Sequence, residues 1–169
     1  MCSSDLEERR RARFVVVGDT PADIPGDHLG ECRELARACG LAGVFEFPGF
    51  TADVRPWVED FDTVVLPSVY PDPLPRTVIE GMAYGLPVVA FDVGGVGEMV
   101  RSGETGALLP ADTTPEALAD VMLGYLRDPD RVAREGARAR AVVVEAFDAR
   151  QHGRKIHAQI VEAARARRR

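Results

Sequence analysis

The 169-residue chain has no long hydrophobic run, few cysteines and few histidines, and each shortage excludes a class of protein. Without a run of about eighteen apolar residues, or a signal-peptide pattern at the N-terminus, we expect no membrane-spanning helix. The three cysteines are odd in number and lack metal-ligand spacing, so we expect reduced thiols at Cys32 and Cys39 in a cytoplasmic protein. The three histidines form no ligand cluster, and we expect neither a metal nor a cofactor.

The absence of repeats and of a dinucleotide-binding glycine motif disfavours further classes of protein. The chain has no internal repeat, and Gly18 opens the sequence Gly-Asp-Thr-Pro-Ala-Asp instead of Gly-x-Gly-x-x-Gly, which disfavours a dinucleotide oxidoreductase. The net charge of −6 and the hydrophobic content of 46% are typical of a soluble globular domain, and we expect no nucleic-acid partner. Residues 165–169 are mostly arginine. We expect a solvated tail there, with peripheral contact to an anionic lipid surface as the alternative.

The segment from Pro67 to Glu98 carries most of the functional information. The short apolar run just before it, Val64 to Leu66, predicts a buried strand. Four prolines then exclude regular structure for about nine residues, because proline fixes φ and lacks an N–H. We expect a helix that begins at Pro75 and ends near Gly85, which suits a left-handed C-cap and is followed by Pro87.

The start of this helix has the chemistry of an anion site. A helix that begins at Pro75 leaves the N–H groups of Arg76, Thr77 and Val78 without partners inside the helix. These donors and the helix dipole favour an anion such as a diphosphate, and Arg76 adds a positive charge suited to phosphate oxygens. Further along the helix, Glu80 can accept two hydrogen bonds from a cis-diol such as that of a ribose.

A second carboxylate, Asp72, lies in the proline loop and is placed to accept hydrogen bonds from sugar hydroxyls. Each of these residues also has an ordinary alternative, because Asp72 suits a turn while Arg76 and Glu80 suit a solvated helix surface. The complete order is more specific than any one member. It consists of a strand, a proline loop, a helix, a buried strand at 88–91 and the sequence Gly-Gly-x-x-Glu from Gly94.

Apolar strands alternate with helices along the rest of the chain. We expect strands at 13–18, 44–50 and 105–110, and helices at 30–40, at 53–60, from Thr114 and, as two more helices, from Asp128 onward. In the helix at 30–40, we expect Leu35, Ala36 and Ala38 on or near the apolar face. This alternation predicts an α/β fold with a Rossmann-like, doubly wound parallel sheet, in which ligands bind beyond the C-terminal ends of the strands.

The segment from Pro67 to Glu98 closely resembles the donor-sugar site of the retaining glycosyltransferases of the GT-B fold, family-4 type. The similarity extends over about residues 13–150. A pair of acidic residues separated by seven others marks this site in the family, and Asp72 and Glu80 match that spacing, with Asp72 where Glu is usual. The resemblance implies that Asp72 is the catalytic-site carboxylate at the transferred sugar and that Glu80 binds the ribose.

The resemblance also implies a wider set of donor-binding residues. The Gly-Phe-Gly of many family members corresponds to Pro73, Leu74 and Pro75, and Pro75 has no N–H to donate. Two positions outside this segment belong to the set, one in a glycine turn after the first strand and one after the strand that usually faces the nucleotide base. The complete donor-binding set is Leu74, Pro75, Arg76, Thr77, Glu80, Gly18 and Phe50.

The resemblance divides the chain into three parts. Residues 1–12 are expected to be a non-native or disordered segment, 13–150 a nucleotide-sugar donor-binding Rossmann-like domain, and 151–169 a C-terminal helix and basic tail. This pattern matches one incomplete half of a GT-B fold, with C-terminal helices. An acceptor domain and the opening strand with its Arg…Lys pair are not found in the sequence. We therefore expect a fragment that is inactive alone and that aggregates or dimerises through an uncovered sheet.

The function that the resemblance implies is transfer of a sugar from a nucleotide-sugar donor to an acceptor, with retention of configuration and without a metal. The acceptor is unknown: a sugar, a lipid-linked sugar or a small molecule. The expected location is the cytoplasm, with the inner face of the membrane as a variant. One alternative is a non-catalytic nucleotide-sugar-binding domain or subunit that needs a separate acceptor domain. A nucleotide-sugar epimerase is disfavoured by the Asp72–Glu80 spacing.

Overall fold

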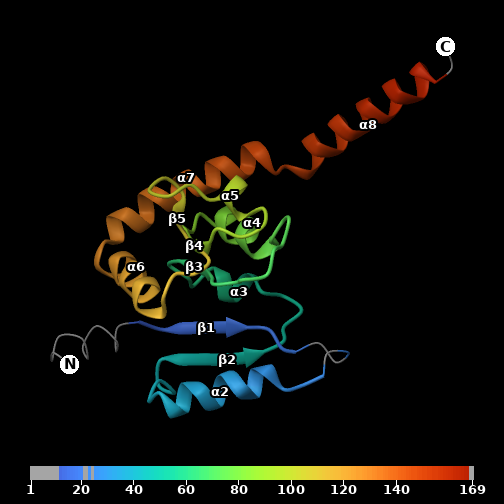
Figure 1. The fold of residues 1–169 in the computed structure, drawn as a ribbon. Helices are drawn as coiled ribbons and strands as arrows, with labels where there is room; N and C mark the ends of the chain where they lie inside the picture. Colours follow the sequence, from blue (N-terminus) through green and yellow to red (C-terminus); the bar gives the residue numbers. More distant parts are fainter. Residues whose placement is uncertain (1–11, 21–22, 24, 168–169) are drawn as a thin grey trace. The chain divides into compact units, whose positions relative to one another are not determined.

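The computed structural model describes residues 12–20, 23 and 25–167. Almost all of the segment predicted over residues 1–12 lies outside the described residues. The chain divides into two compact units, one ending at Asp60 and the other starting at Phe61. Each unit has its own parallel sheet (Figure 1). The domain predicted over 13–150 includes residues of both units, and its boundaries stay a prediction.

The described residues of the N-terminal unit form two strands and two helices. In chain order these elements are β1 (Phe14–Val17), α2 (His28–Ala38), β2 (Phe45–Gly49) and α3 (Arg55–Val58). Strands β1 and β2 pair in parallel with Phe14 opposite Phe45, and the rings of these two residues stack with centroids 4.7 Å apart. Both strands confirm the prediction from the sequence.

The buried face of α2 differs from the expected one. Leu29 and Ala36 are buried, and their spacing of seven residues places them on the same side of the helix. Leu35 is 65% exposed and Ala38 is also exposed. The prediction that Leu35 and Ala38 lie on or near the apolar face was therefore wrong. The reason is that Leu35 is rotated by about 100° from Ala36 around the helix axis.

Aspartates bond to the first turns of α2 and α3, as the N-cap residue of α2 and from just before the N-cap of α3. Asp27 accepts the N–H of Gly30 at 2.8 Å, so α2 starts earlier than the predicted Gly30. Asp53 Oδ1 accepts the N–H of Arg55 at 3.1 Å ahead of α3, which is shorter than the predicted 53–60. Hydrogen bonds from the side chain and backbone N–H of Arg55 hold the pKa of Asp53 below its usual value.

The C-terminal unit contains a three-stranded parallel sheet in the order β3-β4-β5. Its elements are β3 (Val64–Leu66), α4 (Arg76–Ala83), β4 (Val88–Phe91), α5 (Val96–Met99), β5 (Gly106–Leu109), α6 (Pro115–Arg127), α7 (Pro129–Ala146) and α8 (Ala149–Ala166). The strands, the helix after the proline loop and the two helices after Asp128 confirm the sequence-based expectations. Parallel strands linked by helices also confirm the predicted α/β fold class.

The core of this unit lies around the central strand. All four residues of β4 are buried, and Val78 and Met82 of α4 are fully buried. Helix α4 lies very close to β3 at Gly81, where an added Cβ would come within 2.5 Å of Val64 Cγ2. A glycine at this position therefore sets the close approach of the helix to the sheet.

Helix α7 holds the C-terminal end of α4. Gly85 follows this end with a φ of +79°, which confirms the predicted left-handed cap. Arg140 of α7 donates a hydrogen bond to the carbonyl oxygen of Ala83 at 2.7 Å, where it also complements the negative end of the helix dipole. Gly136 of α7 meets the backbone of Gly85 so closely that an added Cβ would overlap the Gly85 carbonyl oxygen.

A buried polar cluster joins α6 to α7. Glu135 accepts hydrogen bonds from the Tyr125 hydroxyl at 2.6 Å and from Arg131 Nε at 2.7 Å. The Arg131 guanidinium also lies 4.0 Å from the centre of the Tyr125 ring. Burial, and then the hydrogen bond to Glu135, raise the pKa of Tyr125 far above its usual value. The hydrogen bond to Glu135 also raises the pKa of Arg131.

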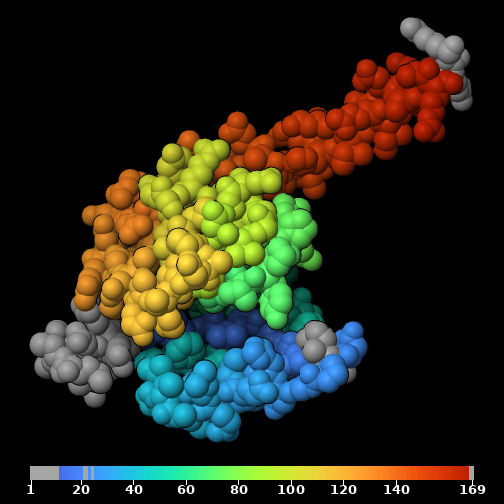
Figure 2. Space-filling view, viewed as in Figure 1, coloured from blue at the N-terminus to red at the C-terminus, as the bar shows by residue number. Residues whose placement is uncertain are grey.

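Helix α8 extends away from the sheet and the other helices of the C-terminal unit (Figures 1 and 2). All of its residues are exposed except Val161, which is half-buried, and the exposed ones include Ile156 and Ile160. Among the helices of the described residues, none has the length and hydropathy that a membrane crossing requires.

Candidate functional site

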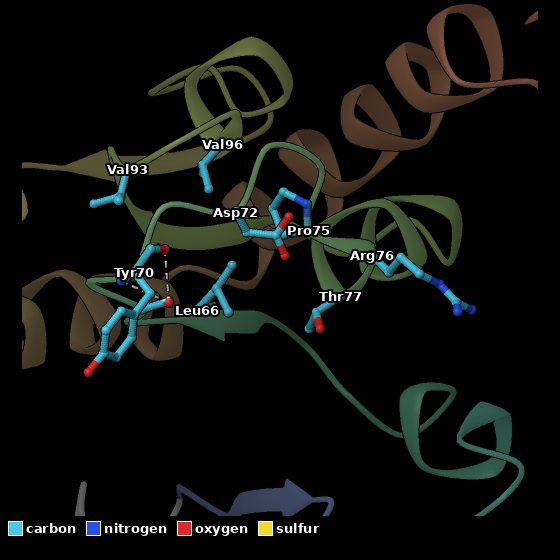
Figure 3. A pocket seen from close by; sticks show the side chains of 9 residues that line it. Leu66, Tyr70, Asp72, Pro75, Arg76, Thr77, Val93 and Val96 are labelled. Atoms are coloured by element: carbon cyan, nitrogen blue, oxygen red, sulfur yellow. Dashed lines mark hydrogen bonds between the residues drawn. The ribbon is translucent and has the colours of Figure 1, made fainter. Parts of the chain in front are cut away.

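A pocket of about 90 Å³ lies in the C-terminal unit, next to the N-terminus of α4 (Figure 3). It is lined by residues of three segments: the end of β3 with the proline loop, the first turn of α4, and the turn after β4 with the first residue of α5. The pocket therefore lies beyond the C-terminal ends of two adjacent parallel strands. This is the position at which ligands bind in open α/β sheets.

Asp72 lies in the pocket wall with its side chain fixed by its own loop. Its Oδ1 accepts the N–H of Leu74 at 2.9 Å, which is the hydrogen bond of an Asx turn. Among the described residues, Oδ2 has no hydrogen-bond partner. Asp72 can therefore be both a turn residue and a ligand-binding residue, because the turn fixes Oδ1 and leaves Oδ2 available to a hydroxyl group.

The glycine pair Gly94–Gly95 packs directly against the backbone of this loop. The Gly95 N–H donates to the carbonyl oxygen of Asp72 at 2.9 Å. A Cβ added to Gly95 would overlap the carbonyl oxygen of Pro73 and lie 2.8 Å from its carbonyl carbon. A Cβ added to Gly94 would lie 2.7 Å from the Asp72 nitrogen, and Gly94 also has a φ of +62°. The pair thus sets the position of Asp72.

The first turn of α4 presents backbone donors at the pocket. Pro75 precedes the helix as its N-cap residue with φ −64° and ψ 112°, so the helix begins at Arg76, one residue later than predicted. The Val78 N–H bonds to the Pro75 carbonyl oxygen at 3.1 Å, so the prediction of three free donors was wrong. The N–H groups of Arg76 and Thr77 have no partner among the described residues, and both residues line the pocket.

Arg76 and Glu80 form an ion pair on the surface of α4. Arg76 Nη2 lies 2.8 Å from Glu80 Oε1, and the side chains are 87% and 40% exposed. In Figure 3 the Arg76 guanidinium extends away from Asp72. The predicted phosphate-binding arginine and the predicted ribose-binding carboxylate are therefore paired with each other in this structure.

The pocket brings together four of the sequence-predicted residues: Asp72, Pro75, Arg76 and Thr77. Leu74 and Glu80 belong to the same unit but do not line the pocket. The remaining two, Gly18 and Phe50, belong to the N-terminal unit. There, Gly18 follows β1 with a φ of +143°, and the Phe50 side chain after β2 is 77% exposed. The roles assigned to all eight residues stay predictions.

Five lining residues were missed by reasoning from the sequence: Leu66, Ser68, Tyr70, Val93 and Val96. Their signal is positional, since each lies at or just after the C-terminal end of β3 or β4. Ser68 supports the loop, because its hydroxyl oxygen lies 3.4 Å from both the backbone nitrogen and the carbonyl oxygen of Tyr70. Tyr70 lines the pocket and its side chain is 81% exposed.

Among the described residues, no three His, Cys, Asp or Glu side chains are grouped to hold a metal ion. Cys32 and Cys39 are free thiols. The residues with polar side chains that line the pocket are Asp72, Arg76, Ser68, Tyr70 and Thr77. The sequence-based expectation that no metal is needed stays a prediction.

Comparison with known proteins identifies the family. The family model described as glycosyl transferases group 1 matches residues 3–128. The chain is 33% identical over 138 residues to the lipopolysaccharide core biosynthesis mannosyltransferase LpsB of Rhizobium meliloti, covering 79% of this chain and 39% of that protein. It is 33% identical over 131 residues to the alpha-D-kanosaminyltransferase of Streptomyces kanamyceticus, covering 76% and 32% respectively. The chain thus spans less than half the length of these relatives.

Solved structures show the same fold. The crystal structure of Anabaena Alr3699/HepE in complex with UDP matches with a TM-score of 0.82 at 25% identity, covering 93% of this chain and 44% of that one. Sucrose-phosphate synthase from Thermosynechococcus elongatus matches with a TM-score of 0.78 at 29% identity, covering 89% and 39%. These matches confirm the resemblance to part of a GT-B glycosyltransferase. The chain belongs to the glycosyl transferases group 1 family.

Proposed function

We propose that this chain forms the donor-binding part of a glycosyltransferase that moves a sugar from a nucleotide-sugar to an acceptor with retention of configuration. The observation that carries the proposal is the pocket at the ends of β3 and β4, where Asp72 and the N-terminus of α4 meet. Relatives support it, since the two named above are a mannosyltransferase and a kanosaminyltransferase. The Anabaena protein was crystallised with UDP and with UDP-glucose.

In this proposal the diphosphate, the sugar and the ribose of the donor each bind to a different part of the site. The diphosphate accepts hydrogen bonds from the N–H groups of Arg76 and Thr77, where the helix dipole favours negative charge. The sugar hydroxyls donate to Asp72, and the ribose hydroxyls donate to Glu80. The pocket of about 90 Å³ is smaller than the roughly 300–1,000 Å³ of typical ligand sites. The pocket therefore accommodates only part of the donor, and we place the portion around the diphosphate there.

The chemistry of these residues is electrostatic. As the bond between sugar and diphosphate breaks, negative charge builds up on the leaving diphosphate, and preorganised N–H donors and a helix dipole stabilise that charge. No metal is needed for this step in the proposal. The alternative, a non-catalytic nucleotide-sugar-binding domain, is not favoured by the named relatives, both of which are transferases. The acceptor is a sugar, a lipid-linked sugar or a small molecule.

Calorimetric titration of the 169-residue chain with UDP, GDP and ADP tests this proposal. We expect one nucleotide to bind at about millimolar or tighter affinity. Glu80→Gln is expected to weaken that binding about tenfold or more, because it removes the charge from a carboxylate that accepts ribose hydrogen bonds.

The matched control is Glu145→Gln, which removes an exposed carboxylate from α7 and is expected to leave binding unchanged. A folded wild-type chain that binds none of the three nucleotides contradicts the proposal. Equal affinity in wild type and Glu80→Gln contradicts the role of Glu80 alone.

A further inference from the structure

Arg76 is paired with Glu80, the carboxylate that the proposed function assigns to the ribose. Its Nη2 lies 2.8 Å from Glu80 Oε1, one helical turn along α4. A cis-diol is held in a paired geometry when it donates one hydrogen bond to each oxygen of a carboxylate. A nucleoside bound at Glu80 in this way would share Oε1 with the Arg76 guanidinium, which weakens its hydrogen bond to that oxygen.

The pair is easily broken, and Arg76 has a second use close by. Its side chain is 87% exposed, and exposed pairs at this spacing contribute little stability because solvent screens them. Arg76 also supplies one of the two N–H groups at the start of α4 that have no partner within the described part of the chain, so an anion held there lies beside the residue's own backbone. A diphosphate at that point attracts the guanidinium more strongly than a single carboxylate does, because it carries more negative charge and can accept paired hydrogen bonds, whereas Glu80 accepts one hydrogen bond from Arg76 here.

We propose that Arg76 makes this site selective for nucleoside diphosphates by changing partners. Arg76 pairs with Glu80 Oε1 until a diphosphate draws the guanidinium away, and both Glu80 oxygens then accept from the ribose without a competing donor. A nucleoside without phosphates must share Glu80 with Arg76 or break the pair with no replacement for Arg76. This inference rests on the proposed function and adds a specificity-determining role for Arg76.

The variant Arg76→Gln tests this inference, because it should lower the affinity for the nucleoside diphosphate and raise the affinity for the nucleoside. We expect this variant to bind the preferred diphosphate about tenfold more weakly, since a charge-assisted contact is lost. The same variant is expected to bind the matching nucleoside about twofold more tightly, because the neutral glutamine competes for Glu80 more weakly than the charged arginine does. Calorimetry with UDP and uridine, GDP and guanosine, or ADP and adenosine measures both effects.

Arg101→Gln is the matched control, because Arg101 is also exposed and paired with a nearby glutamate, Glu104, at 3.7 Å. This control is expected to change neither affinity. If Arg76 has a purely structural role, Arg76→Gln should bind both the diphosphate and the nucleoside more weakly, and that result would overturn the inference. So would a nucleoside affinity that fails to rise in Arg76→Gln, including binding too weak to detect in both proteins. If the wild type binds no diphosphate, the proposed function itself is contradicted. Failure of the proposed function is thus distinguished from failure of the inference about Arg76.

Discussion

Gly136→Ala is expected to destabilise the chain by about 2 kcal/mol, which corresponds to a fall of about 4–8 °C in the thermal midpoint. The cause is steric, because a Cβ at this position of α7 would overlap the Gly85 carbonyl oxygen and lie 3.3 Å from Pro87 Cδ. Backbone cannot move aside as a flexible side chain does. Helix α7 would therefore have to shift away from the end of α4, weakening the hydrogen bond from Arg140 to Ala83.

The control is Gly153→Ala in α8, the same substitution in another long helix. Apart from its chain neighbours and the backbone of its own helix, no atom of the described residues lies within 4 Å of the Cβ that it would add. Alanine is favoured over glycine inside a helix by roughly 0.5–1 kcal/mol, so this variant is expected to be neutral or slightly more stable. Differential scanning calorimetry of both variants measures the contrast. A Gly136→Ala chain as stable as the wild type would show that α7 does not pack on Gly85.

Gly95→Ala is expected to weaken nucleotide binding about tenfold while the chain stays folded. The backbone at Gly95 has φ −88° and ψ 4°, a conformation that alanine can adopt, so the effect comes mainly from the new contact. The new Cβ would overlap the Pro73 carbonyl oxygen. The proline loop must then move, which disturbs the hydrogen bond from Gly95 to Asp72 and displaces the carboxylate from the pocket.

Gly97→Ala is a control from the next turn. Its added Cβ would come within 2.8 Å of Asp92 Oδ1, the end of an exposed side chain that can rotate away. We expect binding to be unchanged in this variant. Calorimetric titration of both variants, with circular dichroism to verify folding, measures the difference. Equal affinities in Gly95→Ala and the wild type would mean that the glycine pair does not position the Asp72 loop.

The local signals in the sequence were sufficient to predict the elements around the pocket. Prolines up to Pro75 fix the loop and the start of α4, and Gly85 fixes its end, because both residue types act through their own backbone. Apolar runs predicted β3 and β4 for a similarly local reason, since buried parallel strands are continuously hydrophobic. These features depend on neighbours in sequence and need no knowledge of the rest of the fold.

The features that the sequence did not reveal depend on contacts between distant residues. Nothing near Gly136 indicates that it meets Gly85, and nothing near Gly95 indicates that it meets Pro73. Leu35 was predicted to lie on the apolar face of α2 because its residue type is apolar, yet the packing partners of that helix leave it exposed. The Arg76–Glu80 pair follows from a spacing of four, but its competition with a ligand becomes visible only with the pocket in place.

Amide mapping by NMR during a nucleotide titration tests the donor-site assignment most directly. With the nucleotide that binds, the assignment predicts that the largest changes in backbone amide shifts within the C-terminal unit fall on Arg76 and Thr77, whose N–H groups have no partner among the described residues. Smaller changes are expected at Gly94 and Gly95. Saturable binding whose largest shifts in that unit lie in α6, α7 or α8, with Arg76 and Thr77 unchanged, would contradict the assignment of this pocket as the donor site.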